Sequence, residues 1–148
     1  HKMAQQLNLD NSQRLDITCK RGDDFVLQLN LKDENTDAID LGNVSTSTKL
    51  KMEVRTSDDY DIVAATSEDV NIILSTESSA TNSNEFPRPI APASVDAATG
   101  DYKLSVTAAN MKLVPSGLYV YDIQIVNNSL NQTILYGVFK VNEDVTVA

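Results

Sequence analysis

The chain has 148 residues, 41% hydrophobic and 22% charged, a composition typical of one soluble globular domain with its own core. Its 21 acidic and 12 basic residues give a net charge of −9, which excludes a general nucleic-acid binder because such a protein needs a basic face. The single cysteine excludes an internal disulfide framework, and no apolar run approaches the ~20 residues of a membrane span.

The ends of the chain differ from its middle. His1 and Lys2 have the pattern of a cloning remnant before Met3, and no secretory signal follows them. Residues 51–101 carry 10 acidic and 3 basic residues, whereas residues 102–148 carry 3 of each. We therefore expect an N-terminal arm over 1–13, a folded domain over 14–142 and a C-terminal tail over 143–148.

Apolar and polar residues alternate with a period of two along much of the chain, and this pattern predicts half-buried strands. In Phe25–Lys32 one face carries Phe25, Leu27, Leu29 and Leu31. The same alternation predicts strands over residues 15–20, 49–55 and 101–106. A short apolar run predicts another strand over residues 70–74.

The two strands nearest the C-terminus have the clearest pattern. Leu118–Val126 alternates, and Gln132–Val141 is apolar on both faces, which predicts a central position in a sheet. The polar segment Asn127–Asn131 is expected to join them as a hairpin.

Turn and helix signals divide the rest of the chain. Asp33–Asp37 predicts a turn before Ala38–Leu41, and residues 97–100 predict a tight hairpin in which Gly100 takes a positive φ. The one helical segment is expected over Thr107–Leu113, where Thr107 is the cap and Pro115 ends it.

Seven or eight short strands with one short helical turn predict an all-β fold, an immunoglobulin-like antiparallel β-sandwich. The run from Leu113 to Tyr119 resembles the corner of immunoglobulin-like and fibronectin-type domains, where a tyrosine hydroxyl bonds to backbone just upstream. We assign this structural corner to four residues: Leu113, Pro115, Gly117 and Tyr119.

Residues 75–93 form a long irregular segment that holds three of the four prolines. One interpretation is a mobile surface loop. The other is an extended segment that lies along another chain, because apolar residues stand in a polar context; its candidate partner contacts are Phe86, Pro87, Pro89 and Ile90. In the arm, Leu7 and Leu9 either dock as part of an extra strand or belong to a frayed terminus.

The sequence offers little catalytic chemistry, and we expect no enzyme activity and no cofactor. No usable histidine could activate a nucleophile, and Cys19 falls in phase with buried residues. The five glycines are scattered and form no phosphate-binding loop. Calcium is a weak option in two acidic segments that do not fit the EF-hand loop, Asp33–Asp37 and the set Asp58, Asp59 and Asp61.

Several blocks of the chain together resemble small virion proteins of tailed bacteriophages. The first block runs from Leu15 to Phe25 and contains Arg21-Gly22-Asp23. The others follow in the family's order: Ile39-Asp40-Leu41, the strand Leu50–Arg55, the corner Leu113–Asp122, the strand Leu135–Val141, and Glu143-Asp144-Val145-Thr146. The chain is thus similar to immunoglobulin-like modules of phage virions, including the N-terminal domain of baseplate upper proteins.

This resemblance implies a non-catalytic structural or adaptor protein of a phage particle: a baseplate, neck, fibre adaptor or capsid decoration component. Its implied partners are other virion proteins and copies of itself, for example in a trimer, with no nucleic acid and no membrane. It would be made in the bacterial cytoplasm and located in the virion. The segment Ser75–Ser94 is longer than the family's pattern. The alternatives are a host-surface module that binds glycan or protein and, more weakly, a calcium-stabilised adhesion domain.

Overall fold

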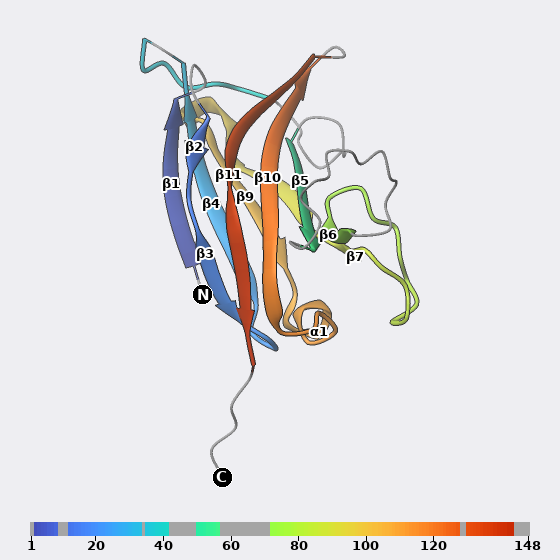
Figure 1. Cartoon of the computed structure of the whole chain (residues 1–148). Helices are drawn as coiled ribbons and strands as arrows, with labels where there is room; N and C mark the ends of the chain where they lie inside the picture. Colours follow the sequence, from blue (N-terminus) through green and yellow to red (C-terminus); the bar gives the residue numbers. More distant parts are fainter. Residues whose placement is uncertain are drawn as a thin grey trace.

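The computed structural model describes residues 2–8, 12–33, 35–41, 50–56, 72–127 and 130–143. The described elements form two β-sheets that pack face to face (Figure 1). In chain order they are β1 Lys2–Asn8, β2 Gln13–Arg14, β3 Ile17–Lys20, β4 Phe25–Lys32, β5 Leu50–Thr56, β6 Ile72–Ser75, β7 Arg88–Pro89, β8 Ala91–Asp96, the 3₁₀ turn η3 Ala97–Thr99, β9 Asp101–Val106, α1 Ala108–Met111, β10 Gly117–Asn127 and β11 Leu130–Asn142.

The predicted all-β sandwich is confirmed. One sheet has the strand order β1-β4-β9-β8, and the seven-stranded sheet has the order β2-β11-β10-β5-β6-β7, with β3 also paired to β11. Four of the pairings are parallel, namely β1 with β4, β2 and β3 with β11, and β6 with β7. The strands in excess of the predicted seven or eight are the N-terminal strand and short pieces that lack a clear alternation.

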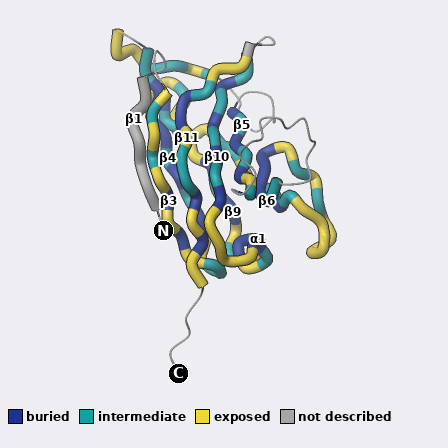
Figure 2. Tube along the Cα trace, in the orientation of Figure 1, coloured by how far each residue is buried: buried dark blue, intermediate teal, exposed yellow. Residues whose placement is uncertain are grey.

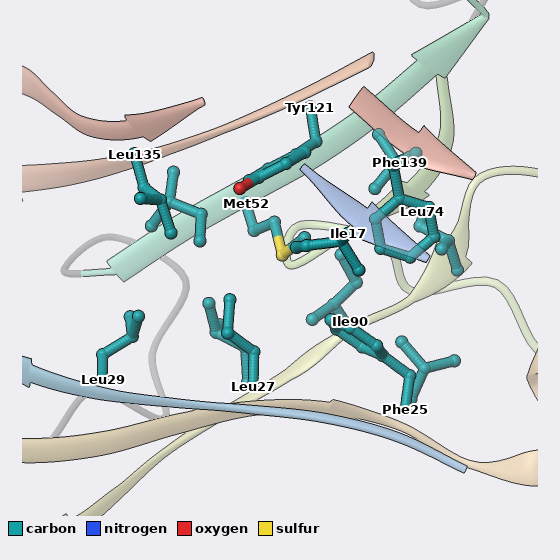
Figure 3. Close-up of a cluster of buried hydrophobic side chains, with 14 of the residues drawn as sticks. Ile17, Phe25, Leu27, Leu29, Met52, Leu74, Ile90, Tyr121, Leu135 and Phe139 are labelled. Atoms are coloured by element: carbon teal, nitrogen blue, oxygen red, sulfur yellow. The ribbon is translucent and has the colours of Figure 1, made fainter. Parts of the chain in front are cut away.

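The core lies between the two sheets and follows from the alternation. Buried and half-buried residues alternate along β4, where Phe25, Leu27, Leu29 and Leu31 are buried (Figure 2). Figure 3 shows the side chains of Phe25, Leu27 and Leu29 in the cluster between the sheets. The opposite sheet contributes buried residues from three strands: Leu50, Met52, Val54, Tyr119, Tyr121, Ile123, Ile125, Leu135, Phe139 and Val141. The ring of Phe139 meets Phe25 edge to face at 5.2 Å and Tyr121 at 6.2 Å, so it connects side chains of both sheets.

Strand β11 lies between β10 and the pair β2 and β3, which confirms its predicted central position. Its register with β10 shifts so that Ile123 pairs with Leu135 and Gln124 with Thr133, which leaves Ile134 as an extra residue. Ile134 and Leu135 are both fully buried, because the bulge turns two successive side chains to the same side.

The predicted helix is confirmed in a shorter form, α1. The Thr107 hydroxyl accepts a hydrogen bond from the Asn110 amide, as an N-cap does. Gly100 ends η3 at φ 80° and leads into β9, so the predicted turn with a positive φ is also confirmed. Ala38 forms only an isolated bridge to Lys32, and residues 128–129 of the predicted hairpin lie outside the described residues.

The expectation that residues 75–93 are one irregular segment is wrong at its C-terminal part. Arg88–Pro89 pairs with β6, and Ala91–Asp96 pairs with β9 at the edge of the four-stranded sheet. Between them, Ile90 is only 3% exposed and belongs to the core. The irregular part therefore shrinks to residues 76–87.

Candidate interaction surfaces

The corner of the sandwich contains the hydrogen bond that its motif predicts. The Tyr119 hydroxyl donates to the Pro115 carbonyl at 2.6 Å, while its ring is buried at the start of β10. Burial also raises the pKa of this hydroxyl. Because α1 and residues 112–116 carry the chain from β9 in one sheet to β10 in the other, this bond fixes the crossing between the sheets.

Tyr119→Phe is expected to lower the free energy of unfolding by about 1 kcal/mol, the usual net value of one hydrogen bond, because the ring packing is retained. Urea unfolding followed by circular dichroism measures the change. Tyr136→Phe is the matched control, since Tyr136 is exposed and a hydroxyl lost there should have no measurable cost. Equal losses for the two variants would contradict the role given to the corner.

Two of the blocks that carry the phage resemblance meet at one end of the sandwich, beside the residue that directly precedes a third. The Arg21 side chain donates through Nε to the Lys112 carbonyl at 3.0 Å and pairs with Glu143 at 3.4 Å. The Arg21 amide also donates to the Asn142 carbonyl at 2.8 Å. The first block thus contacts the last block and Lys112, which directly precedes the corner block, although these segments are far apart in sequence (Figure 1). These contacts hold distant segments of the chain together and so stabilise the fold.

Residues 76–87 are held against the sandwich by a buried cation. Arg88 is 6% exposed, and its guanidinium donates to the carbonyls of Asn82 (2.7 Å) and Glu85 (3.0 Å) and to the amide oxygen of Asn110 (2.8 Å). Asn110 belongs to α1, so Arg88 connects the loop to the helix near the corner. These bonds satisfy a charged group that would otherwise be costly to bury.

The predicted partner contacts of this loop differ in their exposure to solvent. Phe86 is 44% exposed at the end of the loop, and Pro87 and Pro89 are half-buried. Ile90 does not lie in the exposed context that we expected, because its backbone bonds to Ser75 and its side chain fills the core. Phe86 is therefore the one large apolar side chain that this loop offers to a partner.

The N-terminal segment forms a strand at the edge of the four-stranded sheet. Lys2–Asn8 pairs in parallel with β4, and Leu7 lies opposite Leu31 in the register. Leu9 lies outside the described residues. The extra strand that was one interpretation of the arm therefore forms within this chain, on the four-stranded sheet.

Among the described residues, there is no group of three or more His, Cys, Asp or Glu side chains that could hold a metal ion. In the 33–37 turn, one Asp33 oxygen accepts hydrogen bonds from the amides of Asn35 and Asp37, so this carboxylate caps the turn. The second calcium option, Asp58, Asp59 and Asp61, falls outside the described residues. None of the described helices has the length and apolar character to cross a membrane.

A row of charged side chains crosses the outer face of the seven-stranded sheet. Glu53 of β5 pairs with Lys51 at 3.8 Å and with Arg55, and Asp122 of β10 lies directly opposite Glu53. Burial raises the pKa of the Asp122 carboxyl, and Glu53 raises it further, while Arg55 and Lys51 act in the opposite direction. The alternation in β10 predicts that Asp122 points outward, but its partial burial depends on neighbouring strands and was not predicted.

Asp122→Asn is expected to stabilise the protein at pH 7. The pKa of Asp122 in the folded state lies above that of the unfolded chain, so the folded state binds the proton more tightly, and the free energy of unfolding falls as pH rises through that interval. The gain should disappear at pH values below the pKa of the unfolded chain, where both states are protonated. Thermal melts at several pH values measure it.

Asp101→Asn is the control, because its effect on stability at pH 7 should have the opposite sign. Hydrogen bonds from Thr99 (2.7 Å) and Asn30 (2.6 Å) lower the pKa of Asp101, so its carboxylate stabilises the fold at neutral pH and loses that effect as pH falls. Asp101→Asn should therefore lower the melting temperature at pH 7. Shifts of the same sign for both variants would contradict the assigned environments.

Comparison with known proteins finds matches among solved structures alone. No family model matches the chain, and no curated protein matches it. Among solved structures, the chain is similar to the N-terminal domain of phage TP901-1 ORF48, with a TM-score of 0.44 and 8% sequence identity over 96% of this chain and 99% of that one.

Proposed function

We propose that this chain is a non-catalytic structural or adaptor component of a tailed-phage particle that acts by binding other virion proteins. The observation that carries the proposal is the series of sequence blocks that resemble phage virion modules in the family's order. The contact of Arg21 with Glu143 supports it, because it joins the first and the last of these blocks in one structural unit. A baseplate position is the finer proposal, and homo-oligomeric assembly is part of it.

The proposed mechanism is passive binding through surfaces that the sandwich leaves open. In the four-stranded sheet the two edges differ. The β8 edge contains Pro92 and a register shift between Ser94 and Asp96, and both features hinder the addition of another strand. The β1 edge has a regular register along Lys2–Asn8 and contains no proline, so we propose β1 as the edge at which a partner strand adds.

Electron microscopy of labelled particles tests this function. Particles are purified from cells that encode the chain and are stained with gold-conjugated antibodies against it. We expect gold at one fixed position on each particle, and gold at the baseplate would support the finer proposal. Label only on cell debris, with bare particles, would contradict a virion role.

Host-surface binding is the second candidate, and it is supported by the presentation of Phe86. An aromatic side chain that is 44% exposed, on a loop fastened by Arg88, is available to an outside partner. Fluorescently labelled protein and whole host cells test this role, with Phe86→Ser as the variant. Saturable binding that Phe86→Ser reduces at least about tenfold would favour it, and no binding above background would remove it.

A further inference from the structure

The outer faces of the two sheets differ in character. On the four-stranded sheet the outward residues of β4 are Val26, Gln28, Asn30 and Lys32, which are mostly polar, and β9 adds the exposed Lys103. The one large apolar side chain exposed there among the described residues is Val95, 56% exposed at the register shift of the edge strand β8. On the seven-stranded sheet, β10 exposes Leu118 at 53% and β11 exposes Tyr136 at 43%. Large apolar side chains on an outer sheet face are typical of a surface that another protein covers.

The register places these apolar residues in one compact group. Val120 lies opposite Val138, Leu118 opposite Lys140, and Asp122 opposite Tyr136. We call these six residues the outer patch. Val120 and Val138 form its centre and are half-buried, whereas Asp122 and Lys140 lie on opposite sides of this central pair.

The outer patch contains two charged residues, Asp122 and Lys140, and the Asp122 carboxyl also lies in the field of Arg55 and Lys51. None of the ion pairs formed among the described residues includes Asp122 or Lys140. Glu53, the carboxylate next to Asp122, is already bound by Lys51 and Arg55. The outer patch therefore has one partly buried anion and one exposed cation, placed symmetrically about an apolar centre.

We propose that a second copy of this chain packs face to face on the outer patch around a two-fold axis. A two-fold axis brings each Lys140 opposite the partner's Asp122 if it runs parallel to the sheet face, passes between Val120 and Val138, and is perpendicular to the line from Asp122 to Lys140. Leu118 and Tyr136 then lose their exposure to water. The proposal rests on the assembly function above, because it names one partner for that function. The expected oligomer is a dimer, whereas the phage resemblance suggests a trimer.

The test is the mass of the full chain in solution. Sedimentation equilibrium is run from about 10 μM to about 1 mM, the range in which a dissociation constant of a modest interface would fall. We expect a reversible dimer. Lys140→Glu should raise the dissociation constant at least about tenfold, because it places a glutamate opposite the partner's Asp122. Leu118→Ser should also weaken the dimer by removing apolar contact.

Two further variants make the result specific to this face. Lys103→Glu is the matched control, because it makes the same charge change at an exposed strand position on the other sheet and should leave the dissociation constant unchanged. Lys140→Glu combined with Asp122→Lys should restore the dimer, since the ion pairs re-form with reversed sign. Circular dichroism checks that each variant is folded.

Three results would overturn the proposal: a monomer or a trimer over the whole range, a dimer that Lys140→Glu leaves unchanged, or an equal loss with Lys103→Glu. The phage function is tested separately by the labelled particles. Gold at a fixed position with a monomeric chain would reject the two-fold contact alone, whereas bare particles with a dimeric chain would reject the virion role alone.

Discussion

Gly100→Ala is expected to lower the free energy of unfolding by about 2–4 kcal/mol, a large effect for one methyl group. Gly100 has φ +80°, a conformation that L-residues with a side chain rarely adopt, and a Cβ atom there would lie 2.4 Å from the carbonyl oxygen of Leu31. That oxygen accepts a hydrogen bond from Ile39, and the Leu31 amide donates to the Gly100 carbonyl. The backbone of Leu31 therefore cannot move aside cheaply.

Gly117→Ala is the matched control for this prediction. A Cβ atom at Gly117 would lie 3.8 Å from the Tyr119 ring, which is ordinary van der Waals contact. Gly117 also has a positive φ of +159°, so its substitution strains the backbone without a close contact, and the loss should be smaller than that of Gly100→Ala. Urea denaturation of both variants gives the two numbers, and a Gly100→Ala variant as stable as Gly117→Ala would contradict the close approach of Gly100 to Leu31.

Phe139→Ala is expected to cost about 3–5 kcal/mol, because the substitution leaves a cavity between the two sheets. The Phe139 ring is fully buried, and it contacts Phe25 from the opposite sheet and Tyr121 from its own (Figure 3). A loss of this size is a large part of the stability of a domain of this length.

Phe86→Ala tests whether burial, not residue type, sets that cost. Phe86 is 44% exposed, so the same substitution should change the free energy of unfolding by less than about 1 kcal/mol. Chemical denaturation with a common slope for all variants makes the comparison valid. Similar losses at the two positions would mean that Phe139 does not connect the sheets.

The parts of the fold that could be predicted are those with a local signal. The alternation in Phe25–Lys32 directly sets which side chains of β4 are buried, and Thr107 caps α1 with its own hydroxyl. Tyr119 bonds to Pro115 only four residues away, so a short motif was enough to find it. Each of these features depends on neighbours in sequence.

The parts that could not be predicted depend on contacts between distant segments. Ile90 stands among prolines in a polar context, yet the pairing of β7 with β6 directs it into the core. Arg88 is a charged residue that is buried only because Asn82, Glu85 and Asn110 supply its acceptors. Residues 2–8 lack an apolar alternation, and they form β1 only through the parallel pairing with β4.

The same reasoning applies to the outer patch. The alternation in β10 predicts which of its residues point outward, but it does not say that Leu118 and Val120 lie beside Lys140 and Val138. That arrangement follows from the strand register, which brings the exposed cation and the partly buried Asp122 to opposite sides of one apolar centre. The sequence alone therefore contained the residues of the surface but not their arrangement.

The copy number of this chain per phage particle tests the proposal that it is a built-in part of such a particle. Purified particles are digested, and peptides of this chain are quantified by mass spectrometry against isotope-labelled standards and against the major capsid protein. We expect the same integer number of copies per particle in every preparation, and salt washing should not lower it. Absence from particles, or a variable number that washing removes, would contradict the proposal.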